Sequence, residues 1–164
     1  MTSRDANFIN LYDKYVDSIY RFIYFRVGDK DTAWDITQDC FLKALEYIAE
    51  NEVRQPRAFL YQVARNLVID HWKLRGRQSS VELSEVDIID DTNIEADLDI
   101  KNRVKEIMGV VGELPDHHRD LLILRYVDDL SFSEIAEILN KSQVSLRVQV
   151  SRLIKDLRLK LVEE

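Results

Sequence analysis

Apolar residues recur at steps of three and four along most of this chain, which is the spacing of one face of an α-helix. Over residues 5–27 the apolar stripe comprises Phe8, Leu11, Tyr12, Tyr15, Ile19, Phe22 and Ile23. Residues 32–50 repeat the pattern, and a third stripe begins after Pro56. Gly28 and Asp29 lie between the first two stripes, where they can end one helix and cap the next. The N-terminal half is therefore predicted to form three helices around one small core.

A second set of helical patterns begins at residue 101. It covers residues 101–112 and then 115–127, with Pro115 at the first helical position. Ser131 and Glu134 have the spacing of a capping box ahead of another apolar stripe. The C-terminal half is therefore predicted to form four helices, the last of them ending near the C-terminus.

The junction before the last helix has its own signals. Asn140 can end a helix in the left-handed conformation, and Ser142 can cap the next one. Valines and a leucine alternate over residues 144–150, which is typical of a strand, but the leucines continue at steps of three and four to Leu161. The last segment is therefore predicted to be a helix. A short helix, a tight connection and a longer helix over residues 131–152 have the layout of a helix-turn-helix.

Charge is distributed unevenly along the 164 residues. The total of 23 Lys and Arg against 30 Asp and Glu gives a net charge of −7, which at face value argues against nucleic-acid binding. Residues 1–78 carry +1, residues 79–100 carry −8 and residues 101–164 carry zero. Residues 54–77 contain six Lys or Arg and one Asp, and residues 141–160 contain the same numbers. The sequence thus predicts an all-α protein of two small helical domains, 1–78 and 101–164, joined by an acidic linker at 79–100.

Two stretches of the N-terminal half could bind partners. On the third helix, Gln62, Arg65, Asn66, Asp70, Lys73 and Arg77 are predicted to lie outside the core, with Tyr61 and Trp72 beside them. Aromatic, amide and basic groups are what single-stranded bases and phosphates require, although a core Trp beside a basic helix end explains the pattern about as well. On the second helix, an acidic stripe containing the exposed Leu42 favours a docking face over a merely solvated one.

Catalytic and metal-binding interpretations are weak. His117 and His118 have Glu113 four residues before the first of them, but no further Cys or His lies nearby to complete a metal site. Cys40 lies on the buried stripe of its helix, which indicates a packed thiol in a reducing, cytoplasmic protein. No apolar run is long enough to span a membrane, and no glycine-rich phosphate loop occurs. We expect neither a cofactor, a metal nor an enzymatic activity.

Three blocks of the sequence, in this order and spacing, resemble one known family. They are DITQDCF, AFLYQVARNLVIDHW and the block that runs from LP to LLILRYVDDLSFSEIAEIL. The chain resembles the RNA polymerase sigma factors of the small extracytoplasmic-function type (sigma-70 family, group 4), which keep only conserved regions 2 and 4. The resemblance covers nearly all of the chain outside the acidic linker.

The resemblance implies a function for each block. The DITQDCF helix would dock on the β′ clamp helices of core RNA polymerase through Asp35, Gln38, Asp39 and Leu42. The third helix would recognise and melt the −10 promoter element through Asn66, Asp70, Trp72, Lys73, Arg75 and Arg77, and the loop at 50–57 would hold a flipped base. The C-terminal domain would bind the β flap and read the −35 element through Arg147, Gln149, Ser151, Arg152 and Lys155. An anti-sigma protein is a common family partner.

The last helix departs from the family pattern at Val148, where a polar contact with DNA is usual. We therefore hypothesise weak or altered −35 specificity, supported by contacts with thymine methyl groups, by the −10 element or by a helper protein. Two alternatives remain open. One is a stand-alone helix-turn-helix regulator, which would not need the Leu42 stripe or the basic third helix. The other is a module that captures a helical partner, which would leave both basic segments unexplained.

Overall fold

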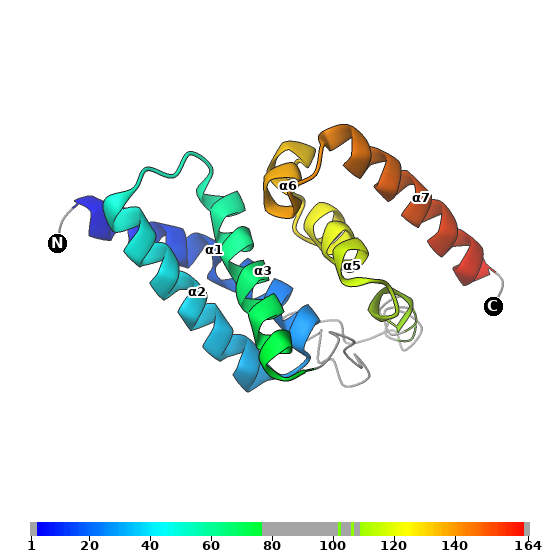
Figure 1. The fold of residues 1–164 in the computed structure, drawn as a ribbon, viewed down its shortest axis with the longest axis horizontal. Coiled ribbons are helices and arrows are strands. Elements are labelled where there is room, and N and C mark those ends of the chain that lie inside the picture. The colour runs from blue at the N-terminus through cyan, green and yellow to red at the C-terminus, as the bar shows by residue number, and fades with distance from the viewer. Residues whose placement is uncertain (1–2, 77–101, 103–105, 107–108, 163–164) are drawn as a thin grey trace.

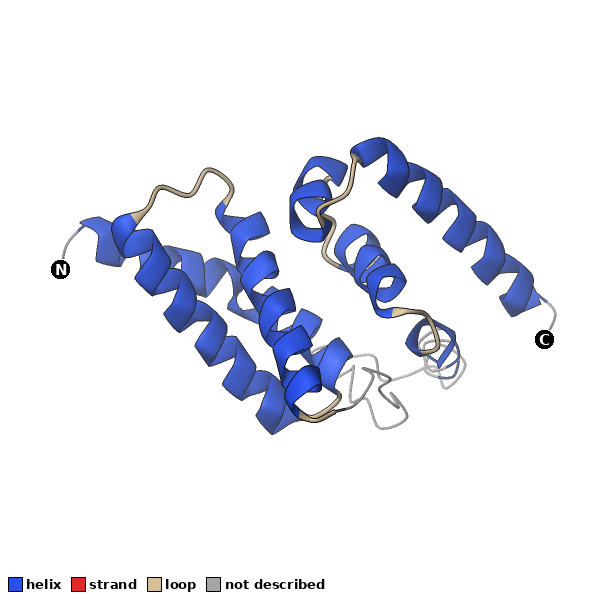
Figure 2. Cartoon of the chain, viewed as in Figure 1, coloured by secondary structure: helices blue, strands red, loops and turns tan. Residues whose placement is uncertain are grey.

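A computed structural model of the chain describes residues 3–76, 102, 106 and 109–162. The predicted linker at 79–100, half of the predicted helix at 101–112 and Arg77 lie outside the described residues. Every regular element in the described part is a helix, as Figure 2 shows. The all-α prediction is confirmed, and the alternating residues at 144–150 are helical.

The N-terminal half consists of three helices, α1 (Ser3–Val27), α2 (Lys30–Glu50) and α3 (Pro56–Leu74). The predicted boundaries are confirmed to within two residues. Asp29 caps α2, because its side chain accepts a hydrogen bond from the Thr32 backbone N–H at 2.8 Å. Pro56 occupies the first turn of α3, where the missing N–H costs no helical hydrogen bond.

The C-terminal half contains α5 (Asp116–Leu122), η2 (Ile123–Val127), α6 (Phe132–Leu139) and α7 (Gln143–Val162). Residues 109–112, which precede them, are also helical. The single helix predicted at 115–127 is instead an α-helix that continues into one π-helical turn, and Pro115 is its N-cap rather than its first residue. Wider i→i+5 turns of this kind are uncommon and have no simple sequence signal.

The helix-turn-helix geometry is fixed by three capping residues. Ser131 and Glu134 form the predicted capping box at the start of α6. Asn140 ends α6 with φ 54° and ψ 49°, in the left-handed region that asparagine tolerates. The Ser142 hydroxyl then accepts a hydrogen bond from the Ser145 N–H at 3.1 Å, as predicted. These caps hold α7 at a defined angle to α6.

The two halves lie side by side, with α3 next to α5 and α6 in Figure 1. The buried side chains of α1, α2 and α3 form one continuous cluster with those of α5, η2, α6 and α7. The last six residues of α1, Phe22 to Val27, are all buried. In the described part of the chain, no helix has the length and apolarity needed to cross a bilayer.

Candidate nucleic-acid interface

The predicted docking stripe lies on the exposed face of α2. Asp35 and Asp39 are exposed, and 58% of the Leu42 surface is open to solvent. Gln38 is only half-buried, and its Nε2 lies 3.4 Å from the Tyr12 hydroxyl. The stripe is therefore an apolar side chain flanked by carboxylates on a helix whose other face is anchored in the core.

Three further apolar side chains of α2, those of Trp34, Leu45 and Tyr47, are exposed, and sequence reasoning missed them. Trp34 and Tyr47 have 46% and 47% of their surface in solvent. Trp34 packs edge-on against Tyr20 with the ring centroids 5.7 Å apart. The sequence did contain a signal for this exposure, because these apolar residues lie directly beside the acidic stripe along the chain. The exposed face of α2 is therefore more apolar than the four residues of the predicted docking stripe suggest, and an exposed apolar patch is typical of a binding face.

Cys40, on the opposite side of α2, is fully buried and its Sγ lies 3.5 Å from the Leu60 carbonyl. Burial raises the pKa of the thiol to about 12. A thiol with that pKa stays protonated at neutral pH and is a poor nucleophile. The prediction of a packed thiol is confirmed.

Four of the predicted −10 residues on or directly after α3 are exposed: Asn66, Asp70, Lys73 and Arg75. Trp72 is not among them, because only 9% of its surface is exposed and its indole Nε1 donates to the Arg26 carbonyl at 3.1 Å. Tyr61 is also buried. The prediction that both rings lie beside the exposed face was wrong. Tyr61, Ala64, Val68 and Trp72 follow helical spacing and belong to the core stripe.

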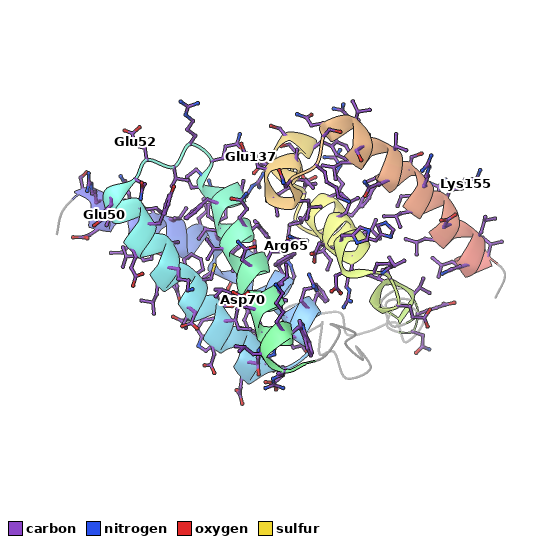
Figure 3. The ribbon with its side chains drawn as sticks, in the orientation of Figure 1. Glu50, Glu52, Arg65, Asp70, Glu137 and Lys155 are labelled. Atoms are coloured by element: carbon purple, nitrogen blue, oxygen red, sulfur yellow. The ribbon has the colours of Figure 1, made fainter. Side chains whose placement is uncertain are left out.

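The other polar side chains of α3 contact the C-terminal half. Arg57 donates from Nε and Nη2 to the two carboxylate oxygens of Glu134, at 2.7 and 2.5 Å. Arg65 Nε donates to Asp120 at 3.1 Å. Gln62 Nε2 donates to the Glu137 carbonyl oxygen at 2.7 Å. Figure 3 shows Arg65 on the side of α3 that faces α5.

The Arg57–Glu134 pair changes the pKa of both groups. The hydrogen bond from Arg57 is the main cause that lowers the pKa of the Glu134 carboxyl. The same bond raises the pKa of Arg57. A two-point contact between a guanidinium and a carboxylate fixes orientation as well as charge. This pair therefore holds the start of α3 against the start of α6.

A second charged contact lies deeper between the halves. Arg26 at the end of α1 is 1% exposed, and its Nη1 donates to Asp120, which is fully buried. Arg26 also lies 3.4 Å from Asp116, which Arg119 contacts at 3.0 Å. Sequence reasoning missed these charges. The available signal was spacing, since Arg26 continues the apolar stripe of α1 four residues after Phe22.

Asp128 makes a third contact across the halves. Its side chain is 1% exposed, and it accepts a hydrogen bond from Arg21 of α1 at 2.6 Å. Burial raises the pKa of the Asp128 carboxyl, and the nearby Arg21 only partly offsets that effect. The pKa of Asp128 is therefore raised and the pKa of Glu134 is lowered, although both carboxyls lie at the same interface between the halves.

The predicted −35 residues lie along α7. Arg147, Ser151, Arg152 and Lys155 are exposed, as is Val148 with 42% of its surface. Gln149 is half-buried and donates to the Ser145 hydroxyl at 2.9 Å. Lys155 lies on the outer side of α7 in Figure 3. These exposed basic side chains lie on a helix whose opposite face is buried through Leu146, Val150 and Leu153.

A groove of about 700 Å³ runs along α7. Arg147 and Arg125 both lie over the Phe132 ring, with the guanidinium carbons 5.2 and 4.3 Å from its centroid. Apolar and basic side chains line the groove: Tyr126, Phe132, Arg147, Val150, Ser151, Ile154, Lys155, Arg158, Leu159 and Val162. Its chemistry suits an apolar helix that carries negative charge.

No metal centre is present among the residues that the structure describes, since nowhere do three His, Cys, Asp or Glu side chains come together to hold an ion. The rings of His117 and His118 pack edge-on against each other, with their centroids 4.1 Å apart. Burial and the neighbouring His118 lower the pKa of His117.

Two family descriptions match the chain. Sigma-70 region 2 matches residues 11–78, and Sigma-70, region 4 matches residues 105–157. Together they include α2, α3 and the helix-turn-helix, and they leave out the whole acidic segment at 79–100.

Curated relatives are similar over most of the chain. The chain is 31% identical to the ECF RNA polymerase sigma factor BldN of Streptomyces coelicolor over 158 residues, and it spans 58% of the length of that protein. It is 31% identical to the ECF RNA polymerase sigma factor SigM of Bacillus subtilis and covers 84% of it. For the B. subtilis sigma factor SigW the identity is 28% and the coverage 83%.

Two solved structures share the fold. One is the sigma factor RpoE in complex with the anti-sigma factor NepR from Bartonella quintana, with a TM-score of 0.74, 21% identity and coverage of 94% of this chain and 96% of that one. The other is CnrH in complex with the cytosolic domain of CnrY, with a TM-score of 0.70, 20% identity and coverage of 98% and 90%.

Proposed function

Because this chain belongs to the extracytoplasmic-function family of RNA polymerase sigma factors, which direct promoter recognition, we propose that its surfaces divide that task between three helices. In this proposal α2 binds core RNA polymerase, α3 engages the −10 element and α7 engages the −35 element. The single observation that carries the division is that each helix presents a different chemistry on its exposed face. Sigma factors are not enzymes, and the family assigns this chain no catalytic residue.

The α2 surface supports docking on the β′ clamp helices of the polymerase. Leu42 and Trp34 supply exposed apolar area, and Asp35 and Asp39 flank it with negative charge. Such a face binds a helical partner that carries apolar and basic side chains. The buried side of α2 fixes the backbone of this face, so little backbone freedom is lost on binding.

The exposed residues at the C-terminal end of α3 support contact with the −10 element. Asn66 offers an amide for a base edge, and Lys73 and Arg75 offer cations for phosphates. The loop at 50–57 before α3 is the proposed site for a flipped base. Trp72 contributes through the core here, because it anchors α3 to the end of α1.

The basic face of α7 supports contact with the −35 element, and the groove beside it supports a protein partner. Arg147, Arg152 and Lys155 suit phosphates and guanine edges, whereas Val148 suits a thymine methyl group. The groove is proposed to bind the β flap of the polymerase. An anti-sigma factor is the other proposed occupant, because NepR and CnrY accompany the two solved structures of this fold.

The decisive experiment reconstitutes transcription with the purified chain, core polymerase and a genomic promoter library. We expect promoter-specific transcripts with chain and core together and none with either alone. Sequencing the 5′ ends would identify the promoter, and footprinting would show whether the −35 region is strongly protected.

Two results would contradict the proposal. Failure of the chain to co-migrate with core polymerase would remove the role of α2. Tight sequence-specific binding of duplex DNA by the free chain, without transcription, would favour the stand-alone helix-turn-helix regulator.

A further inference from the structure

The ring of Phe132 holds two cations at the start of the helix-turn-helix. The guanidinium carbon of Arg125 lies 4.3 Å from the ring centroid, and that of Arg147 lies 5.2 Å from it. A cation over an aromatic ring is attracted by the negative charge of the ring face. Arg125 is fixed further, because its Nη1 donates to the Leu130 carbonyl oxygen at 3.0 Å. One side chain of η2 and one of α7 therefore present their charges at the same place.

The backbone on both sides of this contact is also fixed. Phe132 is the first residue of α6, and the capping box formed by Ser131 and Glu134 encloses it. Arg147 lies in the second turn of α7, directly after the fully buried Leu146. Because both helices are anchored in the core, the ring and the guanidinium groups are in position before any partner binds. Binding then costs little further ordering of these side chains.

The two arginines over the ring form no ion pair within the part of the chain that the structure describes, whereas Arg57 and Arg65 of α3 each contact a carboxylate. Like charges held near one another repel, and an anion placed between them removes that repulsion. Guanidinium groups bind phosphate oxygens at two points and with defined geometry. The arrangement therefore fits a phosphate that accepts hydrogen bonds from both side chains.

We propose that Arg125 and Arg147 together bind one phosphate of the −35 duplex, and that Phe132 is the residue that positions them. We call these three residues the phosphate clamp. This inference rests on the proposed function, in that α7 engages the −35 element. The layout of a helix-turn-helix supports a phosphate at this place, since its first helix crosses the DNA backbone and its second enters the major groove. Sequence reasoning assigned neither Arg125 nor Phe132 to the DNA surface.

The clamp limits which residues of α7 can read the DNA sequence. Phosphate contacts position a protein on DNA and carry no direct information about the bases. With Arg147 held over the ring, base edges are left to Val148 and Arg152, which are exposed and do not line the groove. Val148 offers only an apolar contact, such as one with a thymine methyl group. The −35 element should therefore contribute affinity mainly through its backbone.

The groove beside α7 leaves room for a protein partner at the same time. Phe132 and Arg147 line it near the start of α7, and Leu159 and Val162 line it in the last turns. Arg147 and Val162 are separated by about 22 Å along the helix, at about 1.5 Å per residue. An apolar helix that binds at the last turns of α7 therefore need not displace a phosphate from Arg147.

The primary experiment measures the affinity of the holoenzyme for promoter duplex at several salt concentrations. The promoter is the one that the transcription assay identifies. Arg147→Ala should weaken binding at least about threefold and reduce the slope of log K against log salt by about one, because one phosphate contact is lost. Phe132→Leu removes the ring and should weaken binding about threefold, the size of an exposed cation–π contact. Phe132→Tyr keeps the ring and should bind as the native chain does.

A double-mutant cycle distinguishes positioning from a general loss of stability. If the ring acts through Arg147, the effect of Phe132→Leu should fall by at least about half in the Arg147→Ala background. Lys155→Ala is the matched background, since it removes another exposed cation of α7. There Phe132→Leu should keep its full effect. Equal losses in the two backgrounds would overturn the positioning role, and urea denaturation would establish that each variant is folded.

A second measurement tests whether Arg147 contacts a phosphate or a base. The affinity for the promoter is divided by the affinity for the same duplex with an unrelated sequence in place of the −35 element. Arg147→Ala should leave this ratio unchanged, because a phosphate contact does not depend on sequence. Arg152→Ala should lower the ratio, since its side chain is left to read a base edge. A fall of the ratio in Arg147→Ala would overturn the clamp.

Failure of the clamp can be distinguished from failure of the proposed function. A chain that forms no promoter-specific complex with core polymerase would contradict the proposed function. The clamp is then tested in the free chain with a mixed-sequence duplex at low salt, where Arg147→Ala and Phe132→Leu should still weaken binding. Unchanged affinities there would overturn it. Weaker core binding with unchanged DNA binding in Phe132→Leu would also overturn it, because the two arginines would then bind a protein.

Discussion

The two basic segments of this sigma factor, 54–77 and 141–160, carry six Lys and Arg each and use them differently. On α7, Arg147, Arg152 and Lys155 are all exposed. On α3, Arg57 and Arg65 are half-buried against carboxylates of α5 and α6. Only the C-terminal end of α3 presents exposed cations, at Lys73 and Arg75.

The difference shows why charge counted along a sequence does not by itself locate a binding surface. Both basic segments have a local net charge of +5. Their availability depends on which acids the fold brings next to them, and those acids are 55 and 77 residues away along the chain. A basic face that is open in the free chain can start a search for DNA, whereas a paired one binds after a conformational change.

The largest expected effect concerns the two faces of α7. Leu146→Ala should lower the free energy of unfolding by about 2–5 kcal/mol, because Leu146 is fully buried. Val144→Ala, on the same helix and 70% exposed, should change it by less than about 0.5 kcal/mol. Urea denaturation measures both. Similar losses in the two variants would mean that α7 does not present the face described here.

The next effect concerns the α2 surface. Asp39→Arg should weaken binding to core polymerase at least about tenfold, because it reverses an exposed charge beside Leu42. Asp13→Arg is the control, since it makes the same charge change at an exposed position of α1. Fluorescence anisotropy with labelled chain measures both affinities. Normal core affinity in Asp39→Arg would remove the docking assignment.

A smaller effect should distinguish α7 from α3. Val148→Arg should tighten binding of promoter duplex a few-fold and increase the salt slope by about one, because it adds one phosphate contact. The distance between the halves should not change, since Val148 lies on an exposed face of α7. Val162→Arg, in the last turn and 82% exposed, is the control. Equal gains in both variants would indicate a general charge effect.

The smallest expected effect is on the pH dependence of the contact between the two halves of the chain, which we call the closed state. The lowered pKa of Glu134 means that its contribution to the closed state is present above its unfolded pKa near 4.5 and is lost as pH falls through the lower folded value. Asp128 acts in the opposite direction, because its raised pKa favours the protonated form when closed.

Lowering the pH from 7 to 4 should therefore open Asp128→Asn more than the native chain, whereas Glu134→Gln should become more closed, because only the opposite effect of Asp128 remains. The distance between fluorophores at Lys14→Cys and Ser133→Cys, which line one pocket between the halves, measures this. An identical pH response in all three chains would contradict the opposite shifts of the two carboxyls.

Much of the fold was predictable because its signals are local. Asp29, Ser131, Asn140 and Ser142 cap helices as expected, since each cap depends on a few neighbouring backbone groups. The exposed positions of Asp35, Asp39 and Leu42 on α2 also followed from helical spacing.

The rest depended on packing between distant segments. Trp72 and Tyr61 were assigned by the chemistry of their rings, whereas the core stripe of α3 determined their position. Burial of Arg26 and Asp120 requires the other half of the chain as a partner, and nothing in either local pattern specifies that pairing. The π-helical turn at 123–127 likewise has no local signal.

The most direct test follows the distance between labels at Lys14→Cys and Ser133→Cys, two exposed positions that line one pocket between the halves, in one chain, first free and then in the complex with core polymerase and promoter DNA. The free chain should show the short distance of the closed form, and the complex should show a separation that approaches the spacing of the two elements, about 85 Å. An unchanged short distance in a complex that initiates transcription would contradict the closed form as a state that must open.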